Sequence, residues 1–354
     1  MENIDKKNVL LGLTLHELQA LVIEFGMPAF TAKQITQWLY QKQAVSFDDM
    51  TNISKANRQI LEEHCVIGRM EPIKTLVSKD KTEKYLFPTI DGQYVETVMI
   101  PDHDRATLCV SCQIGCKMNC LFCQTGKQGF HGDLTPADIL NQIISVNSRL
   151  IEDGKTPLTN IVYMGQGEPL DNLDNVMKTL DILTADYGWA WSPKRITVST
   201  CGIKKGLRRF LEESECNLAI SLHSPIHEQR ESLMPAEKAY PMDAMIKDLM
   251  HYFPRNEREV RQRRLSFEYI VFDGFNDSNL HLKELVKLLS PLDCRINLIR
   301  WHRIPDIDMN TSDEKRLETM RDYLTAHGIF TTIRASRGED IFAACGLLST
   351  AEQR

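Results

Sequence analysis

The chain has no long hydrophobic run and no obvious export signal. No stretch approaches the roughly 20 consecutive apolar residues that are needed to span a bilayer. The opening Met-Glu-Asn-Ile-Asp-Lys-Lys lacks the apolar core of a signal peptide. Low-complexity segments and internal repeats are also missing. We therefore expect a cytoplasmic protein with no membrane partner.

Excess positive charge is also missing. The formal net charge of −6 argues against a protein that coats nucleic acid through charge alone. Basic residues do gather locally, in the run 255–264 and in the cluster 204–209. The members of these two groups are Arg255, Arg258, Arg261, Arg263 and Arg264, and Lys204, Lys205, Arg208 and Arg209. Either group could contact phosphates or only face solvent, so charge leaves the substrate open.

Cysteine, in contrast, is plentiful, and five of the ten cysteines crowd into residues 109–123. They are too close together for a disulfide framework, and clustered thiols in a reducing compartment indicate metal or redox chemistry. Cys116, Cys120 and Cys123 follow the spacing C-x3-C-x2-C. Three thiolates suit a [4Fe–4S] cluster with one open iron that can bind S-adenosylmethionine (SAM). A structural zinc ion needs four ligands, and this alternative remains open because Cys112 could supply the fourth sulfur.

The chain is long enough for one large domain and a smaller one. Thr14 and Thr31 each begin a capping-box pattern and Ser54 is a candidate cap, which predicts short helices over residues 1–70. Beyond residue 70, strand-like and helix-like stretches alternate. Strands are expected at 95–100, 107–112, 160–165, 196–200, 217–222, 267–272, 296–300 and 330–334, and helices at 135–151, 172–184, 204–213, 242–252, 279–289 and 313–327. This alternation predicts a parallel sheet closed or nearly closed into a barrel, with catalytic groups after the carboxyl ends of its strands.

Polar residues follow three of the expected strands. Gly167 and Glu168 come after the strand near 160–164, where a glycine permits close approach and a carboxylate can accept hydrogen bonds from SAM. The other groups are Ser199-Thr200 and Ser221-Leu222-His223. A simpler explanation, in which polar residues only end the strands, is left open by these positions alone.

Several of these motifs together resemble the RlmN/Cfr family of radical SAM methyltransferases, which methylate adenine in RNA. The matching stretches are 107–111, the cysteine motif, 125–130, 167–170, 199–200, 221–224, 297–299, 337–341 and 343–346. The likeness covers nearly the whole chain, and Ala343-Ala344-Cys345-Gly346 is its most family-specific part. The resemblance implies a (β/α)6-type partial barrel of the radical SAM kind over residues 71–354. It also implies a small helical N-terminal domain, residues 1–70, that assists RNA binding.

The resemblance also implies a reaction that uses two cysteines. Cys345 takes a methyl group from one SAM, and a second SAM is cleaved at a [4Fe–4S] cluster held by Cys116, Cys120 and Cys123. The resulting radical removes hydrogen from the methyl group on Cys345, and the carbon adds to adenine C2. Cys109 then attacks the Cys345 sulfur and releases the product as a disulfide forms, while Glu96 matches the position of the base that takes the ring proton.

For SAM, the resemblance implies contacts from residues at the strand ends and from one position, His302, where this chain differs from the family. The residues are Gly167, Glu168, Ser199, Ser221, Leu222, His223 and His302. Family members have an asparagine where this chain has His302, and histidine differs from asparagine in geometry and charge.

The implied substrates are 23S rRNA and tRNA, and the implied electron donor is a flavodoxin or ferredoxin. We expect a monomer. Adenine C8, the position methylated by Cfr-type resistance enzymes, is the alternative to C2. A radical activase or mutase would use the same cluster without needing Cys109 and Cys345 as a pair.

Overall fold

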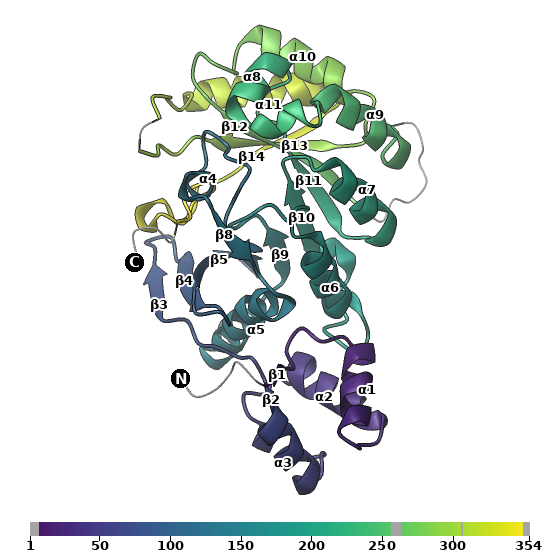
Figure 1. The fold of residues 1–354 in the computed structure, drawn as a ribbon. Helices are drawn as coiled ribbons and strands as arrows, with labels where there is room; N and C mark the ends of the chain where they lie inside the picture. The colour runs from purple at the N-terminus through teal and green to yellow at the C-terminus, as the bar shows by residue number, and fades with distance from the viewer. Residues whose placement is uncertain (1–6, 256–262, 306, 350–354) are drawn as a thin grey trace.

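The computed structural model describes residues 7–255, 263–305 and 307–349, and its centre is one large twisted sheet (Figure 1). The ten strands have the order β14-β13-β12-β11-β10-β9-β6-β5-β4-β3. They are β3 (Lys74–Val77), β4 (Glu83–Pro88), β5 (Tyr94–Asp102), β6 (Arg105–Cys109), β9 (Asn160–Tyr163), β10 (Ile196–Thr200), β11 (Asn217–Ser221), β12 (Leu265–Val271), β13 (Arg295–Arg300) and β14 (Phe330–Ile333). From β14 to β6 all neighbours are parallel, whereas β5, β4 and β3 continue the sheet antiparallel. The predicted α/β architecture with a parallel sheet is confirmed.

Helices cover the sheet between successive parallel strands. They are α5 (Pro136–Glu152), α6 (Leu173–Thr184), α7 (Lys204–Glu213), α8 (His227–Leu233), α9 (Met242–Tyr252), α10 (Asn279–Leu289) and α11 (Glu314–Ala326). The central strands β11 and β12 are buried almost throughout, as expected in the middle of a parallel sheet that helices cover. In β12 every residue is buried. The six helices expected after residue 112 are all present, and two short helices, α4 (Gln124–Gln128) and α8, are additions.

The N-terminal part is helical, as predicted. It contains α1 (Leu15–Glu24), α2 (Phe30–Thr36), a π-helical turn (Gln37–Gln41) and α3 (Lys55–His64), and the short strands β1 (Asn8–Val9) and β2 (Cys65–Val66) pair at its base. The caps expected at Thr14 and Ser54 are formed. The cap expected at Thr31 is wrong, because α2 already begins at Phe30 and places Thr31 inside the helix. The boundary near residue 70 remains a prediction.

The segment after β14 crosses from one edge of the sheet to the other. Asp340 accepts hydrogen bonds from the Ser78 hydroxyl (2.5 Å) and the Lys79 backbone (3.2 Å), both in the turn between β3 and β4. The Gly338 backbone donates to Asp80 in the same turn (2.9 Å). The edge strands β14 and β3 are therefore joined through an irregular segment that carries Cys345. Within the described residues, no helix is long and apolar enough to cross a membrane.

Candidate functional site

The three motif cysteines lie in a loop that is closed at its base. The loop leaves β7 (Gln113–Gly115), passes through α4 (Gln124–Gln128) and returns as β8 (Phe130–Asp133). The Cys116 backbone donates to the Gly129 carbonyl (3.0 Å). A Cβ on Gly115, whose φ is +71°, would lie 1.7 Å from the same carbonyl oxygen, so only glycine fits there. The cysteines are thus held in a compact loop directly after β7.

The surroundings of these thiols fit a sulfur-bound cluster better than one metal ion. Burial raises the pKa of the Cys116 thiol to about 12, and nearby Cys123 raises it further. The walls are apolar, and they include Phe272 and Trp301. Among the described residues, no three His, Cys, Asp or Glu side chains converge closely enough to hold a single metal ion. Three neighbouring thiols with apolar walls are a donor set of the kind that iron–sulfur clusters take.

Cys112, the possible fourth zinc ligand, is used differently. Its thiol is buried and donates to the Gln166 carbonyl at 3.7 Å. The Cys112 carbonyl accepts from the Asn172 side chain (2.8 Å). These contacts tie the segment between β6 and β7 to the loop after β9, so the structure gives no support to the zinc alternative.

Glu168 joins the ends of two parallel strands. Its side chain is buried, and its two oxygens accept hydrogen bonds from the backbones of Leu170 (3.0 Å) and Cys201 (2.8 Å). Burial raises the pKa of this carboxyl group, and the hydrogen bonds oppose that rise. Gly167 has φ +102°, and a Cβ there would lie 2.5 Å from the Gln113 side chain. Both residues therefore shape the loop after β9, whatever else they contact.

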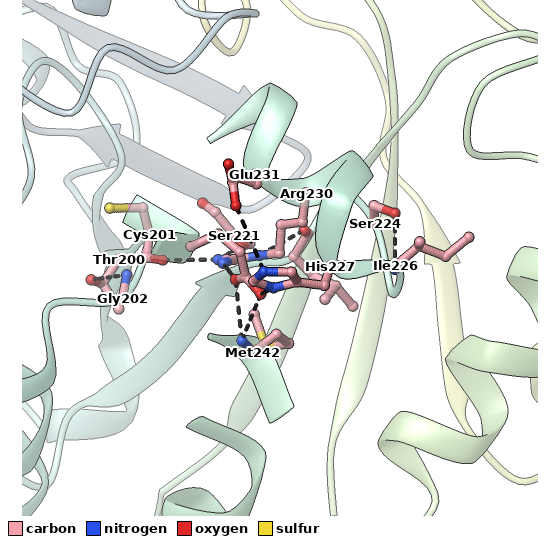
Figure 2. A network of polar contacts seen from close by, with 12 residues as sticks. Thr200, Cys201, Gly202, Ser221, Ser224, Ile226, His227, Arg230, Glu231 and Met242 are labelled. Carbon is pink, nitrogen blue, oxygen red and sulfur yellow. Dashed lines mark hydrogen bonds and ion pairs between the residues drawn. The ribbon is translucent and has the colours of Figure 1, made fainter. Parts of the chain in front are cut away.

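Arg230, a residue that sequence reasoning missed, fixes the ends of β10 and β11 (Figure 2). The guanidinium is completely buried. Its Nε donates to the Leu222 carbonyl (3.1 Å), and Nη2 donates to the carbonyls of Cys201 (2.9 Å) and Ser221 (2.8 Å). Nη1 forms an ion pair with buried Glu237. The sequence gives no sign that Arg230 is buried, because it lies in a helix rich in charged residues. The only available signal was the position of this polar helix directly after the 221–224 motif.

The side chains at these strand ends include the expected SAM contacts. Ser199 and Ser221 are half-buried near the carboxyl ends of β10 and β11, and Leu222 is completely buried. His223 is buried with φ +55°, and its Nδ1 accepts a hydrogen bond from the Ile270 backbone (3.0 Å). Burial lowers the pKa of His223 to about 3, and Arg230 lowers it further. The imidazole is therefore neutral, and its ring meets Phe122 of the cysteine loop edge-on at 4.5 Å.

His302 lies after β13 beside a cavity of about 370 Å³. Its side chain is buried, with Nδ1 3.4 Å from Glu339 Oε1. The adjacent Trp301 packs in the same apolar cluster as the cysteine loop. His302 thus lies on the same side of the sheet as the cysteine loop, and its side chain pairs with Glu339.

Cys109 lies beside the C-terminal segment that carries Cys345, since it packs in the same apolar cluster as Ala343. Cys109 ends β6, and Cys345 is exposed on the C-terminal segment. Burial raises the pKa of the Cys109 thiol to about 12, nearby Cys345 raises it further, and Arg334 opposes the rise. Arg334 also contacts Glu268 (Nη1 to Oε2, 3.4 Å) and the sulfur of Met164 (3.8 Å). Sequence reasoning missed this arginine, which is the cation beside the thiol pair.

Glu96 is completely buried, on the same side of the sheet as the C-terminal segment. Its Oε1 lies 3.0 Å from the Lys84 ammonium, and its Oε2 accepts from the Ser349 backbone (3.0 Å). The same ammonium donates to the Phe342 carbonyl (3.2 Å). The Glu96–Lys84 pair therefore contacts the Cys345-bearing segment on both sides of Cys345.

The two basic groups are largely occupied by internal contacts where the structure describes them. Arg208 and Arg209 pair with glutamates on their own helix, and Arg209 also pairs with Asp174. Arg255 and Arg263 donate to backbone carbonyls. Arg258 and Arg261 lie outside the described residues. These contacts lend no support to an RNA-binding role for either group.

Comparison with known proteins places this geometry among RNA methyltransferases. Residues 8–67 match the ribosomal RNA large subunit methyltransferase N-terminal domain, and residues 110–286 match the radical SAM superfamily. The chain is 58% identical over 347 residues to a Bacteroides thetaiotaomicron protein named "Probable dual-specificity RNA methyltransferase RlmN", which covers 98% of this chain and 97% of the relative. It is 40% identical over 357 residues to the dual-specificity RNA methyltransferase RlmN of Desulfotalea psychrophila, covering 99% and 96%. A crystal structure of a radical SAM methyltransferase from Sphaerobacter thermophilus superimposes with a TM-score of 0.89 at 38% identity, covering 96% of this chain and 98% of that one.

Proposed function

The chain belongs to the RlmN family of dual-specificity RNA methyltransferases in the radical SAM superfamily, and on that premise we propose that it methylates C2 of an adenine in 23S rRNA and in tRNA. The observation that carries this proposal is that the Cys345-bearing segment contacts both Cys109 and the three-thiol loop. Cys109 packs in the same apolar cluster as Ala343, and the Gln124 backbone donates to the Gly346 carbonyl (2.8 Å). Neither a zinc protein nor a radical activase has a use for Cys109 and Cys345 as a pair. The N-terminal helices would help to hold the RNA, and a flavodoxin or ferredoxin would supply electrons to a monomeric enzyme.

Cys116, Cys120 and Cys123 would hold the [4Fe–4S] cluster. When bound there, a cluster of this kind supplies an electron for the reductive cleavage of SAM. The strand-end residues would then line the SAM site: Gly167, Glu168, Ser199, Ser221, Leu222, His223 and His302. Arg230 supports this arrangement because it holds the carbonyls of Cys201, Ser221 and Leu222 in one place.

The protein's own residues would divide the methyl transfer among them. The exposed Cys345 can reach SAM and accept its methyl group as a thiolate nucleophile. Once that carbon is bonded to adenine C2, Cys109 attacks the Cys345 sulfur. A sulfur–sulfur bond forms, and the electron pair of the broken sulfur–carbon bond passes to the carbon, which takes a proton and becomes the methyl group. Glu96 would accept the hydrogen that leaves C2 as a proton. The unpaired electron that radical addition leaves on the adduct would pass to a one-electron acceptor, and the oxidised cluster would be the group able to take it up.

Anaerobic turnover tests this proposal. Iron-reconstituted protein is incubated with SAM, reductant and unmodified 23S rRNA or tRNA, and the nucleosides are analysed by mass spectrometry. We expect 2-methyladenosine from both RNAs. An 8-methyladenosine product would show that the enzyme methylates C8, as Cfr-type enzymes do, and not C2. SAM cleavage without any methylated adenosine would overturn the substrate assignment.

A further inference from the structure

Phe342 is an exposed aromatic residue in an unfavourable backbone conformation. Its side chain is 65% exposed. Its φ and ψ are 52° and 44°, the left-handed region that a side chain with a Cβ disfavours and that glycine adopts freely. The Phe342 side chain thus gains little stabilisation from burial, and a phenylalanine is disfavoured in this left-handed backbone conformation.

The backbone around Phe342 is firmly held, so its conformation is imposed by its neighbours. The Phe342 amide donates to the Glu339 carbonyl (3.1 Å), and the next amide, that of Ala343, donates to Gly338 (2.8 Å). The Phe342 carbonyl accepts from Lys84 (3.2 Å). In contrast, the adjacent Ile341 and Ala343 pack in a small apolar cluster that does not include the Phe342 ring. A strained residue with a fixed backbone and a free ring is typical of a functional position.

The ring is also close to the chemistry. Phe342 precedes Cys345 by three residues, which span at most about 10 Å even when extended. Lys84, which holds the Phe342 carbonyl, also pairs with Glu96. Stacked nucleotides are about 3.4 Å apart, so the Cα atoms of Phe342 and Cys345 lie within about three stacking distances of each other.

Resting on the proposed function, we propose that Phe342 is a specificity-determining residue whose ring stacks on a nucleobase of the RNA, at or next to the target adenine. An adenine that reaches Cys345 has to leave its own stack, which exposes its faces and those of its neighbours. Proteins commonly cover such unstacked bases with aromatic rings. A phenyl ring carries no positive charge and no hydrogen-bond donor for a phosphate, so the base is the part of RNA that it would contact.

The test compares Phe342→Ala, Phe342→Gly and Phe342→Trp in the iron-reconstituted protein. Filter retention gives the Kd for unmodified 23S rRNA and tRNA transcripts, and steady-state turnover gives KM and kcat. We expect the alanine and glycine variants to bind RNA about ten-fold more weakly, which corresponds to about 1.4 kcal/mol, with a matching rise in KM and kcat within two-fold. The tryptophan variant should bind like the original protein. Phe342→Gly should also melt at a higher temperature, because it relieves the backbone while losing the ring.

Phe330→Ala is the matched control. Phe330 is 54% exposed, but it starts β14 at the end of the sheet opposite to the site, so its loss should leave RNA binding unchanged. Unchanged RNA affinity in Phe342→Ala would overturn the inference, as would a tryptophan variant as weak as the alanine variant. Because filter retention needs no turnover, it judges the Phe342 contact even if no methylated adenosine forms, an outcome that would count against the proposed function alone.

Discussion

The Lys84 ammonium and the Glu96 carboxylate form a buried ion pair, 3.0 Å apart, on adjacent antiparallel strands. Both partners also contact the segment that carries Cys345, Lys84 through the Phe342 carbonyl and Glu96 through the Ser349 amide. The pair therefore couples the position of the expected base to the position of the expected methyl carrier.

Lys84→Met should destabilise the protein by about 3–5 kcal/mol, because it removes the ammonium that lies 3.0 Å from the buried Glu96 carboxylate. Denaturant unfolding measures this loss. Adding Glu96→Gln to Lys84→Met should recover much of the stability, since the buried negative charge is then gone. A double variant that is no more stable than Lys84→Met would show that the charge pair is not the cause.

Cys345→Ala should abolish RNA methylation, because no thiol then carries the methyl group. Cys109→Ala should instead accumulate a covalent protein–RNA adduct, because the linkage lacks its resolving thiol. Denaturing gels would show the adduct as a slow-migrating band that ribonuclease removes. Its absence from Cys109→Ala would argue against resolution by a disulfide.

Replacing Cys116, Cys120 or Cys123 with alanine should remove the iron, sulfide and brown colour from the reconstituted protein. Cys112→Ala should keep all three, because the Cys112 thiol already donates to a backbone carbonyl. Metal analysis of the four variants checks this. Iron loss in Cys112→Ala, or stoichiometric zinc in the unaltered protein, would revive the zinc alternative.

Arg334→Met should slow the reactions of Cys109, because it removes the cation that opposes the rise in the pKa of this thiol. With a pKa of about 12, the thiolate fraction grows about ten-fold per pH unit between pH 7 and 10. Alkylation of Cys109 in protein without the cluster, followed by peptide mass spectrometry, should rise accordingly with pH and be several-fold slower in Arg334→Met at each pH. Arg334→Lys should lie between the two. Equal rates in all three proteins would show that the arginine does not act on Cys109.

His223 should make the protein less stable in acid. Its pKa is about 3 in the folded protein and near 6.5 in an unfolded chain. Between these pH values His223 is therefore protonated in the unfolded state and neutral in the folded state. Stability should therefore fall by up to about 1.4 kcal/mol per pH unit between pH 6.5 and 3. His223→Asn cannot titrate, and its unfolding free energy should depend less on pH over this window. Identical slopes for the two proteins would contradict the assignment.

Local sequence patterns made the cysteine loop and the alternation of strands and helices predictable. The three cysteines are neighbours in sequence, and a parallel strand that is covered on both faces shows itself as an apolar run, as in β12. Strand β3 was missed because it is a largely exposed edge strand of four residues. Lys84 was missed for another reason: its contact with Phe342 spans 258 residues. Partners at such distances leave no pattern in a single sequence, and the same holds for Arg334 beside Cys109.

Strand β6 has an antiparallel neighbour on one side and a parallel neighbour on the other, with Cys109 opposite Val98 and Val162. Side chains alternate between the faces of a sheet, so a slip of one residue in β6 would turn Cys109 to the opposite face. The same slip would misplace the start of the cysteine loop, only a few residues further on. A misregistered molecule could thus retain most of its secondary structure and still be chemically inert, which makes strand register a determinant of specific activity in any preparation of this enzyme.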